Sequence, residues 1–469
     1  MSLQQLIDSA KSVADFLVKK AGSSIFQVVS HLDADGLAAA GIISKMLKRL
    51  NARFHVRIVH QLSERALASL PKRERIFVFT DLGSGQLRIL KKVFKEDFIV
   101  IDHHPPEEVA GTVNFMHLNP HLFGVDGSID VSGAGMAYLV AKEVDVSNRD
   151  LSALAVVGAL GDRQDKGEAR SLTGLNAEIV KDGVDVGVLK EVKDLMFFGR
   201  EFRPIPVALE YTMDPFIPGL SGNHAACVKF LNERVKIPLK VGEKWRTISD
   251  LSQQEKSVLV SELVKYMLGP GGMSAEEAQS IVGTVYVLAN ERLGTPVRDA
   301  REFAFLLNAC GRTGKAGLGL AICLGDKKFS EEAIKVAGEY RAKIAEYMNW
   351  LGEGNINVKG DVCWFNGGRY IDERIVGTIT SILSSSKMYR DKIIVGFAYS
   401  EEEGAVKVSA RLGPEIKKEV NLGELMKRIA SKMGLNLVAG GHDLAAGAYI
   451  PAGKENEFIE VLSAELAGL

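Results

Sequence analysis

The chain has few of the features that mark secreted, membrane-spanning or zinc–thiolate proteins. Its 469 residues include only four cysteines, with no Cys-x-x-Cys pair, so neither a disulfide framework nor a thiolate metal site is expected. The longest uninterrupted apolar stretch, Ala153 to Gly161, is far shorter than the about 18 residues of a membrane helix. The first twenty residues carry Asp8 and Asp15 within a helical apolar period and lack the apolar core of a signal peptide. We therefore expect a cytoplasmic protein with buried thiols that does not span a membrane.

The chain also lacks a charge excess of either sign. Fifty-eight basic and fifty-nine acidic side chains leave a formal charge of −1, so overall charge does not favour a nucleic-acid partner, and any such binding must come from a local cleft. The 46% hydrophobic and 25% charged residues are typical of a globular chain and not of a disordered one. At about 100 to 200 residues per domain, the length predicts two to four domains.

Short apolar runs alternate with helical patterns in the N-terminal half, which is typical of a parallel sheet covered by helices. The runs that we interpret as strands are 26–29, 54–59, 75–79 and 98–101. Prolines and glycines in 212–222 interrupt this pattern. Two Ser-x-x-Glu capping boxes, which begin at Ser252 and Ser274, then predict helices. A mostly helical insertion is therefore expected after the first domain.

A long amphipathic helix is predicted from Ser330 to about Leu351, and strand patterns follow it. We predict an α/β protein with a parallel sheet flanked by helices, a helical insertion, a linker helix and a second α/β domain. The expected boundaries are 1–215 for the first part of the N-terminal domain, 216–295 for the insertion, 296–328 for the return to the N-terminal domain, 329–353 for the linker helix and 354–469 for the C-terminal domain.

Polar clusters directly follow three of the predicted strands. They are His31, Asp33 and Asp35 after the first strand, Asp81 after the third, and Asp102, His103 and His104 after the fourth. Because the carboxyl ends of parallel strands meet at one edge of the sheet, we expect these clusters to converge where such folds place their ligands. Asp162, which ends another apolar run, is a further candidate.

Carboxylates gathered in this way repel one another unless a cation neutralises them. The first three clusters contain no Lys or Arg, and carboxylates with imidazoles suit manganese or magnesium better than structural zinc. The spacing of His31, Asp33 and Asp35 points all three side chains the same way if strand geometry persists through them. With Asp81 shared, we expect two ions about 3.5 to 4 Å apart, an arrangement suited to hydrolysis of a phosphoester or pyrophosphate.

These clusters resemble the motifs of the DHH phosphoesterase superfamily. The matching segments are HLDADG at 31–36, TD at 80–81, IDHH at 101–104 and GALGD at 158–162. The superfamily also carries an associated C-terminal domain with a Ser-x-Arg strand and a Gly-Gly-His motif, which match 409–411 and 440–442. The resemblance covers nearly the whole chain outside the insertion. It implies a DHH domain joined by a linker helix to a DHH-associated domain.

Within the superfamily, the chain is similar to the archaeal RecJ-like exonucleases, including the nuclease that associates with the GINS complex of the replicative helicase. LNACGR at 307–312 resembles the Asn-Ala-x-Gly-Arg segment of RecJ proteins. The insertion lies where the GINS-associated nuclease and its catalytically degenerate eukaryotic relative carry an interaction domain. The resemblance therefore makes the GINS complex a candidate partner of the insertion.

The resemblance also implies a role for each motif residue. One metal ion would be held by His31, Asp33 and Asp81, and a second by Asp35, Asp81, His103 and Asp162. His104 would contact the scissile phosphate, and Asp102 would be its supporting acid. In the C-terminal domain, Ser409, Arg411, Gly440, Gly441 and His442 would bind a backbone phosphate. Arg312 is a further candidate for a phosphate contact, and Arg200 and Arg203 could line the path of the nucleic acid.

The implied activity is a two-metal exonuclease that hydrolyses single-stranded DNA from the 5′ end. One alternative with the same chemistry is a 3′-directed RNA exonuclease or a phosphoesterase for short oligonucleotides. An alternative of another class is a replisome scaffold related to the inactive eukaryotic homologue, in which the insertion is the working surface and catalysis is dispensable. The dependence of the rate on substrate length and sugar type would separate the DNA exonuclease from the alternatives with the same chemistry. Capture of a partner by the insertion would test the scaffold.

Overall fold

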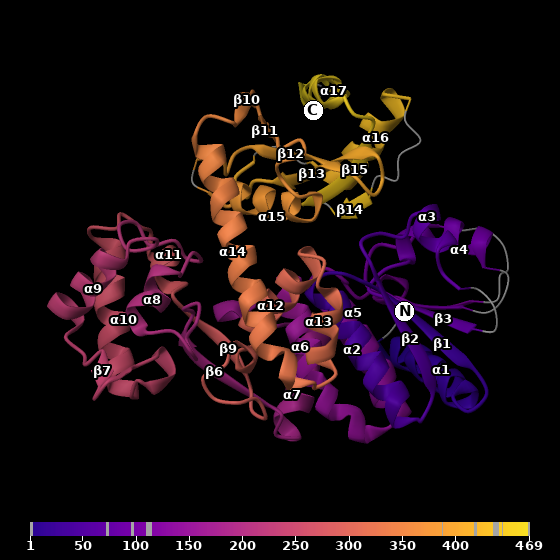
Figure 1. Cartoon of the computed structure of the whole chain (residues 1–469), viewed down its shortest axis with the longest axis horizontal. Helices are drawn as coiled ribbons and strands as arrows, with labels where there is room; N and C mark the ends of the chain where they lie inside the picture. The colour runs from indigo at the N-terminus through magenta and orange to yellow at the C-terminus, as the bar shows by residue number, and fades with distance from the viewer. Residues whose placement is uncertain are drawn as a thin grey trace. The chain divides into compact units, whose positions relative to one another are not determined.

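The chain folds into two compact units, Met1–Val336 and Ala337–Leu469, which are described separately (Figure 1). The structure, a computed structural model, describes residues 3–71, 75–94, 98–108, 115–386, 388–416, 420–434, 440–442 and 444–467. None of the helices in these ranges is long and apolar enough to cross a membrane. All four cysteines are buried and free, as predicted.

A parallel sheet forms the centre of the first unit. In the described residues it comprises β1 (Ile25–His31), β2 (Arg53–Val59), β3 (Arg75–Thr80), β4 (Phe98–Ile101) and β5 (Phe115–Leu118), in the order β2-β1-β3-β4-β5. Phe26, Val28 and Val29 of β1 are fully buried, as expected for a strand covered on both faces. The four strands predicted from the sequence are confirmed, and β5 is an addition.

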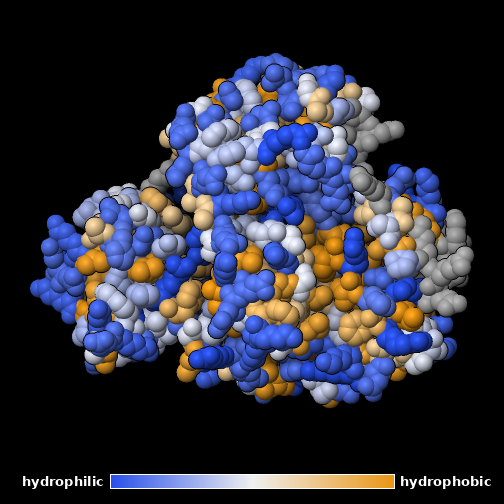
Figure 2. All heavy atoms as spheres, viewed as in Figure 1, coloured by the Kyte–Doolittle hydropathy of each residue, from blue (hydrophilic) through white to orange (hydrophobic). Residues whose placement is uncertain are grey.

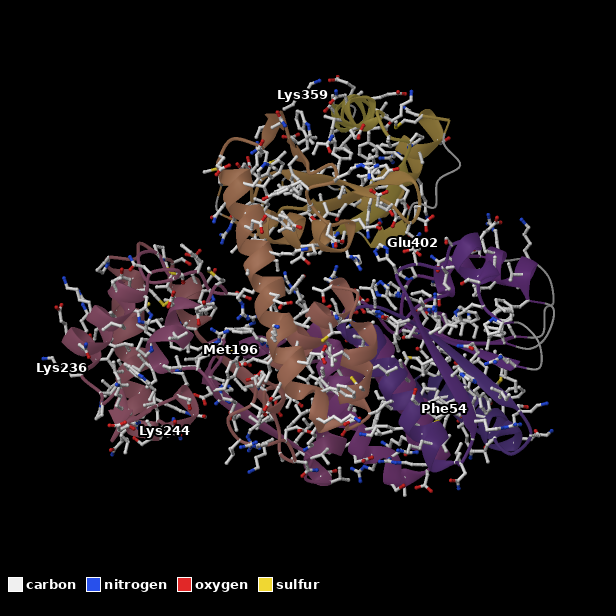
Figure 3. All side chains as sticks on the ribbon, viewed as in Figure 1. Phe54, Met196, Lys236, Lys244, Lys359 and Glu402 are labelled. Atoms are coloured by element: carbon white, nitrogen blue, oxygen red, sulfur yellow. The ribbon has the colours of Figure 1, made fainter. Side chains whose placement is uncertain are left out.

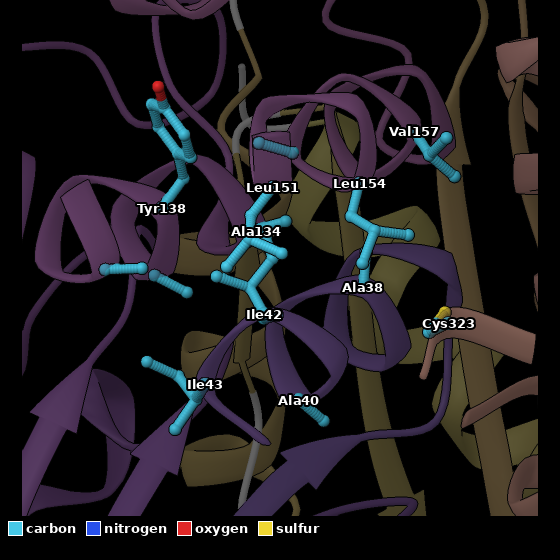
Figure 4. Packing of buried hydrophobic residues seen from close by; sticks show 14 of the residues in the cluster. Ala38, Ala40, Ile42, Ile43, Ala134, Tyr138, Leu151, Leu154, Val157 and Cys323 are labelled. Carbon is cyan, nitrogen blue, oxygen red and sulfur yellow. The ribbon is translucent and has the colours of Figure 1, made fainter. Parts of the chain in front are cut away.

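Helices cover both faces of this sheet. One face packs against α1 (Leu3–Lys20), α2 (Ala34–Arg49) and α5 (Gly133–Val144), and the other against α3 (Glu64–Ala68) and α4 (Leu87–Val93). Small residues of α2, such as Ala38, share one buried cluster with Ala134 of α5 and Leu154 of the next helix (Figure 4). Because Ala adds little volume, the helices beside the strand ends can pack closely.

The longest apolar stretch of the sequence forms α6 (Ser152–Gly161). It packs against α2 and α5, and also against α7 (Gly174–Asp185) and α12 (Ala300–Arg312), the latter being followed by α13 (Ala316–Cys323). A helix surrounded in this way is apolar on all sides. Asp162 is the C-cap residue of α6, so this acid follows a buried helix, whereas the other motifs follow strands.

The insertion begins and ends at a pair of antiparallel strands. β6 (Leu189–Leu195) pairs with β9 (Val282–Leu288), which lies inside the range 216–295. Between them lie α8 (Ile205–Glu210), α9 (His224–Phe230), the hairpin of β7 (Lys240–Val241) and β8 (Lys244–Trp245), α10 (Gln253–Leu268) and α11 (Ala275–Gln279). These helices have a hydrophobic core of their own, and the capping boxes predicted at Ser252 and Ser274 are both present. Exposed lysines such as Lys236 and Lys244 lie on the surface of the insertion (Figure 3).

The prediction that Arg200 lines a nucleic-acid path is wrong. The Arg200 side chain is buried, and its guanidinium donates to Asp194 and, at 2.7 Å, to Glu201. Lys256 of α10 binds the same Asp194 carboxylate at 2.6 Å. Arg200 therefore belongs to a buried charge network that joins the insertion to β6, and its side chain is not available to a ligand.

The linker helix and the second unit also match the predicted pattern. The helix α14 spans Ser330–Gly352. The sheet contains β10 (Asn357–Lys359), β11 (Val362–Asn366), β12 (Ile393–Ser400), β13 (Ala405–Leu412), β14 (Gly440–His442) and β15 (Ala445–Ile450), in the order β10-β11-β12-β13-β15-β14. The helices α16 (Leu422–Lys432) and α17 (Glu455–Ala467) pack on one face, and α15 (Glu373–Ser384) packs against β12 and β13. Hydrophilic residues dominate the surface of this unit in the view of Figure 2.

Candidate metal centre

The first acidic motif occupies a tight turn between β1 and α2. β1 ends at His31, and Asp33 is the N-cap of α2, where its Oδ1 accepts the Gly36 N–H at 3.0 Å. The strand geometry therefore does not persist through the motif, and the predicted reason for convergence of its three side chains is wrong. They converge because the chain turns at once into a helix. Gly36 permits this turn, since a Cβ on it would lie 2.3 Å from the His31 carbonyl oxygen.

His31 and Asp33 form one side of the centre. His31 Nδ1 lies 2.9 Å from Asp33 Oδ2 and 3.7 Å from Asp81 Oδ2. Burial alone would lower the pKa of His31, but these two carboxylates raise it to about 10. Burial alone would raise the pKa of Asp33, but the interaction with His31 holds it well below its ordinary value. The pair is electrostatically matched only while Asp33 is ionised.

Asp81 lies between the two sides of the centre. It follows β3 directly, and its φ of 57° is in the left-handed region that non-glycine residues rarely adopt. Its Oδ2 faces His31, whereas its Oδ1 lies 3.2 Å from His103 Nε2. Both oxygens are buried and have no hydrogen-bond partner among the described residues. Since an unsatisfied buried carboxylate is costly, the chain holds Asp81 in a position suited to a bound cation.

Asp35, His103 and Asp162 form the other side. His103 Nε2 lies 3.2 Å from Asp162 Oδ2 and 3.7 Å from Asp35 Oδ2. Asp35, in the first turn of α2, is fully buried and accepts two backbone hydrogen bonds from the start of α5, from the Gly133 N–H at 2.6 Å and the Ala134 N–H at 2.9 Å. Burial and the charge of Asp81 nevertheless raise the pKa of Asp35 to about 7. Burial and Asp35 likewise raise the pKa of Asp162, so protons are drawn to the place that a cation would neutralise.

Asp102 orients the second histidine of the DHH motif, His104. Its Oδ1 accepts from His104 Nδ1 at 2.8 Å, and its Oδ2 accepts the Ser84 N–H at 2.9 Å. Burial would raise the pKa of Asp102, but the histidine holds it well below its ordinary value. The carboxylate therefore fixes the orientation of the partly exposed His104 ring through Nδ1.

The donor atoms of the predicted ligands fit divalent cations. In each of two groups, the potential ligand atoms lie within 4.8 Å of one another. The first group is His31, Asp33 and Asp81, and the second is Asp35, His103 and Asp162. A third such group contains Asp81 with Asp102, His103 and His104. Carboxylate oxygens with imidazole nitrogens are suitable ligands for manganese or magnesium. The six predicted metal ligands, which come from four separate segments, therefore meet at one place.

The LNACGR segment supports the first motif. The Asn308 side chain accepts the Ala34 N–H at 3.1 Å through its Oδ1. A Cβ on Gly311 would lie 1.6 Å from the Leu32 carbonyl oxygen, so α12 can approach this turn only with glycine there. Arg312, at the end of α12, adds to the positive charge that acts on Asp33. Arg312 is therefore the predicted phosphate contact that lies in the first unit, close to the metal ligand Asp33.

The other predicted phosphate contacts lie in the second unit. β15 lies between β13 and β14, and its Gly447 pairs with Ser409 and Gly440, while its Ala445 pairs with Arg411 and His442. Arg411 Nε donates to Ser381 Oγ of α15 at 3.0 Å. Ser409 Oγ lies 3.2 Å from Thr380 Oγ1. The Ser-x-Arg and Gly-Gly-His motifs thus lie on the two strands that flank β15, and Gly441 pairs with its Ala446.

Sequence reasoning missed several residues that support the centre. They are Ser84, Asn119, Gly127, Gly133 and Gln164, which surround the DHH motif or Asp35. These residues do not titrate, and they lie outside the acidic and histidine motifs, so the sequence does not mark them as part of the site. Proximity of Ser84 to FTD, and of Gln164 to GALGD, was the signal available in the sequence.

Three family models match the chain. The DHH family N-terminal domain matches residues 26–160, the DHH-CID domain matches 197–282 and the DHHA1 domain matches 362–468. An uncharacterised protein of Methanocaldococcus jannaschii is 31% identical over 468 residues, which cover 98% of this chain and 96% of that protein.

Solved structures show the same fold at low identity. RecJ of Thermus thermophilus in complex with Mn²⁺ has a TM-score of 0.58 at 18% identity, and the match covers 100% of this chain but 55% of that one, so this chain spans about half of that RecJ. An exonuclease RecJ bound to manganese has a TM-score of 0.57 at 17% identity, with 100% and 96% covered. CDC45 of Entamoeba histolytica has a TM-score of 0.66 at 12% identity, with 97% and 98% covered.

Proposed function

Because the chain belongs to the DHH phosphoesterase superfamily as a RecJ-like, metal-dependent hydrolase, we propose that it is an exonuclease that hydrolyses single-stranded DNA. We assign it 5′-to-3′ polarity and two manganese ions, with magnesium as an alternative. The similar RecJ structures support this assignment, because they include an exonuclease bound to manganese and a complex with Mg²⁺.

One observation carries the proposal. Asp81 directs one carboxylate oxygen toward His31 and the other toward His103, and both oxygens are buried and unsatisfied among the described residues. One ion would be held by His31, Asp33 and Asp81, and the other by Asp35, Asp81, His103 and Asp162. A carboxylate shared in this way is suited to a pair of ions that acidify the attacking water and offset charge on the phosphate oxygens.

The chain's own residues would orient the substrate. His104, whose Nδ1 is bound to Asp102, would direct Nε2 to the scissile phosphate and hydrogen-bond to one of its oxygens. Arg312 would bind the same phosphate or its neighbour. We assign Ser409, Arg411, Gly440, Gly441 and His442 to a backbone phosphate of the substrate.

End-labelled digestion tests the activity. With Mn²⁺, the protein should shorten single-stranded DNA from the 5′ end, and Asp81→Ala should abolish the reaction because both ions lose a shared ligand. Asp15→Ala, which removes an exposed acid of α1, should digest like the wild type. Undiminished digestion by Asp81→Ala would refute the metal assignment.

The same assay separates the related activities. Strands of DNA and RNA, each labelled at either end, report sugar preference and polarity directly. Degradation of RNA from the 3′ end would replace the proposed activity by the first alternative. A steep fall in rate beyond a few nucleotides would instead identify a short-oligonucleotide phosphoesterase.

The similarity to CDC45 over nearly the full length of both chains favours a second role as a scaffold in the replisome. We propose that the insertion binds the GINS complex. Met213 and Phe216 are 60% and 54% exposed near its start, so Met213→Glu with Phe216→Glu should reduce capture of purified GINS at least tenfold and spare hydrolysis. Val146→Glu, at a 70% exposed position outside the insertion, should leave capture intact. Capture that survives the double substitution would contradict this surface.

A further inference from the structure

Two hydrogen-bond networks hold the rings of the two histidines of the DHH motif, and the His103 backbone N–H also donates to Asp102 Oδ1 at 2.8 Å. The first begins at the Gly127 carbonyl oxygen, which accepts from His103 Nδ1 at 2.6 Å and from Gln164 Nε2 at 2.9 Å. Gln164 Oε1 in turn accepts from Asn176 Nδ2 at 2.7 Å. His103, Gln164 and Asn176 are 1 to 2% exposed. Bulk water therefore cannot replace these bonds.

This network fixes which nitrogen of His103 faces the carboxylates. A carbonyl oxygen can only accept, so Nδ1 of the His103 ring carries a proton, and Nε2 is the atom directed at Asp81 and Asp162. Gln164 holds the carbonyl in place, because its amide donates to Gly127 and, at 3.3 Å, to the Val131 carbonyl oxygen. Gly127 has no room for a side chain, since a Cβ on it would lie 2.0 Å from the His103 oxygen.

The second network surrounds Asp102 and His104. Asn119 Nδ2 donates at 2.8 Å both to the His104 carbonyl oxygen and to Ser84 Oγ. Ser84 Oγ lies 2.9 Å from His117 Nε2, and the Ser84 N–H donates to Asp102 Oδ2. Asn119, Ser84 and Asp102 are fully buried.

The hydrogens of Asn119 set part of this network. Both hydrogens of its amide are used, and Ser84 Oγ accepts one of them. Asn119 thereby fixes the backbone of His104, while Ser84 fixes the carboxylate that orients the His104 ring. None of the bonds in this network involves His103 Nδ1 or Gln164.

We propose that these networks have separate duties, with Gln164 as a positioning residue for metal binding through His103, and Asn119 as a positioning residue for the chemical step through Asp102 and His104. The second duty rests on the proposed hydrolytic function. The first does not, because metal binding can be measured without substrate. A merely structural role would predict that both residues affect stability alone.

Gln164→Met tests the first duty. The substitution keeps the approximate length and volume of the side chain and removes the amide. Manganese affinity, measured by electron paramagnetic resonance of free Mn²⁺, should fall about 10- to 100-fold, as for other groups that orient metal-bound histidines. Saturating Mn²⁺ should restore the hydrolysis rate. Unchanged affinity, or a lost rate that saturating metal does not restore, would overturn this part of the proposal.

Asn119→Asp tests the second duty. It is isosteric and keeps the acceptor that binds the His121 N–H, but it lacks both amide hydrogens. With saturating Mn²⁺, kcat should fall at least tenfold, while manganese affinity stays within about twofold of wild type. Comparable loss of manganese affinity in Asn119→Asp and Gln164→Met would show a single support network and overturn the division.

A readout without turnover keeps the Asn119 assignment testable if the wild type fails to hydrolyse DNA. The His104 Nδ1 resonance in ¹⁵N-histidine-labelled protein, assigned by its loss in His104→Ala, should shift in Asn119→Asp and stay in place in Gln164→Met. An unshifted resonance in Asn119→Asp would overturn the assignment. Asn148→Ala removes a buried amide that binds Arg49 and the Ala141 carbonyl oxygen, and it should change neither manganese affinity nor this resonance.

Discussion

Gly133 lies so close to Asp81 that a Cβ atom on it would sit 2.6 Å from the Asp81 Oδ1 oxygen. The Gly133 N–H also donates to Asp35 Oδ2 at 2.6 Å. The first residue of α5 therefore touches two of the acids assigned to the metal centre and orients one of them. The helix N-terminus adds partial positive charge at the same point, where it offsets part of the repulsion between the carboxylates.

Gly133→Ala should disable the metal centre. The added methyl group must displace the Asp81 carboxylate or the start of α5, so we expect manganese affinity to fall at least about tenfold. Overpacking of this kind costs roughly 1 to 3 kcal/mol of folding stability. Titration with Mn²⁺ and chemical unfolding measure the two effects. Gly22→Ala is the control, because nothing lies within 4 Å of a Cβ at that position, and wild-type affinity in Gly133→Ala would contradict the close contact.

Metal should stabilise the fold through the same acids. Metal-free protein pays for the repulsion of Asp35 by Asp81, whereas a bound ion removes it and adds about 2.7 kcal/mol when free metal exceeds the dissociation constant 100-fold. Thermal unfolding should therefore shift upward with Mn²⁺ and downward with EDTA. Asp81→Asn should gain little stability from Mn²⁺, because both ions lose their shared carboxylate. A wild-type shift in this variant would show that the metal binds elsewhere.

The sequence predicted this centre because its ligands are chemically conspicuous and follow apolar strands. His31, Asp81 and the DHH motif could be placed at one sheet edge from topology alone. The geometry within the motifs could not be predicted in the same way. Asp33 is a helix cap and Asp81 has a positive φ, and both depend on how the chain turns after each strand.

The supporting residues escaped prediction for a different reason. Gln164 and Asn119 act on residues 37 and 15 positions away along the chain, and no periodicity marks such contacts. The buried position of Arg200 was likewise hidden, because its partner Asp194 also binds Lys256, and Lys256 reaches Asp194 only when the insertion packs on β6. A single sequence identifies residues with distinctive chemistry, but packing decides which polar residues support them.

Manganese binding should weaken as the pH falls below about 7. Burial and Asp81 raise the pKa of Asp35 to about 7, and its carboxyl must lose a proton before it can bind the ion. The metal-induced rise in unfolding temperature should therefore be larger at pH 8 than at pH 6. Without metal, the effect of Asp35 on stability has the opposite dependence on pH. Between about pH 4 and 7, folded Asp35 holds its proton to higher pH than the unfolded chain does, so this group lowers folding stability as the pH rises.

Asp35→Asn provides the control for the pH effect. The substitution removes the titrating carboxyl. Without metal, the stability of the variant should therefore fall less between about pH 4 and 7 than the stability of the wild type. Differential scanning fluorimetry at matched ionic strength measures both variants. An identical decline in wild type and Asp35→Asn would show that another group is responsible.

Removal of Arg200 should destabilise the protein and leave its metal centre intact. Arg200→Met would leave Asp194 with Lys256 and deprive the buried Glu201 of its 2.7 Å partner. Breaking a buried ion pair by removing one partner costs about 3 to 5 kcal/mol, which denaturant unfolding can measure. Lys244→Met, at an exposed position of the insertion, should change stability by no more than about 0.5 kcal/mol. Manganese affinity should match wild type in both variants. If Arg200→Met lost nucleic-acid binding without losing stability, Arg200 would be a substrate contact and the buried ion-pair role would be wrong.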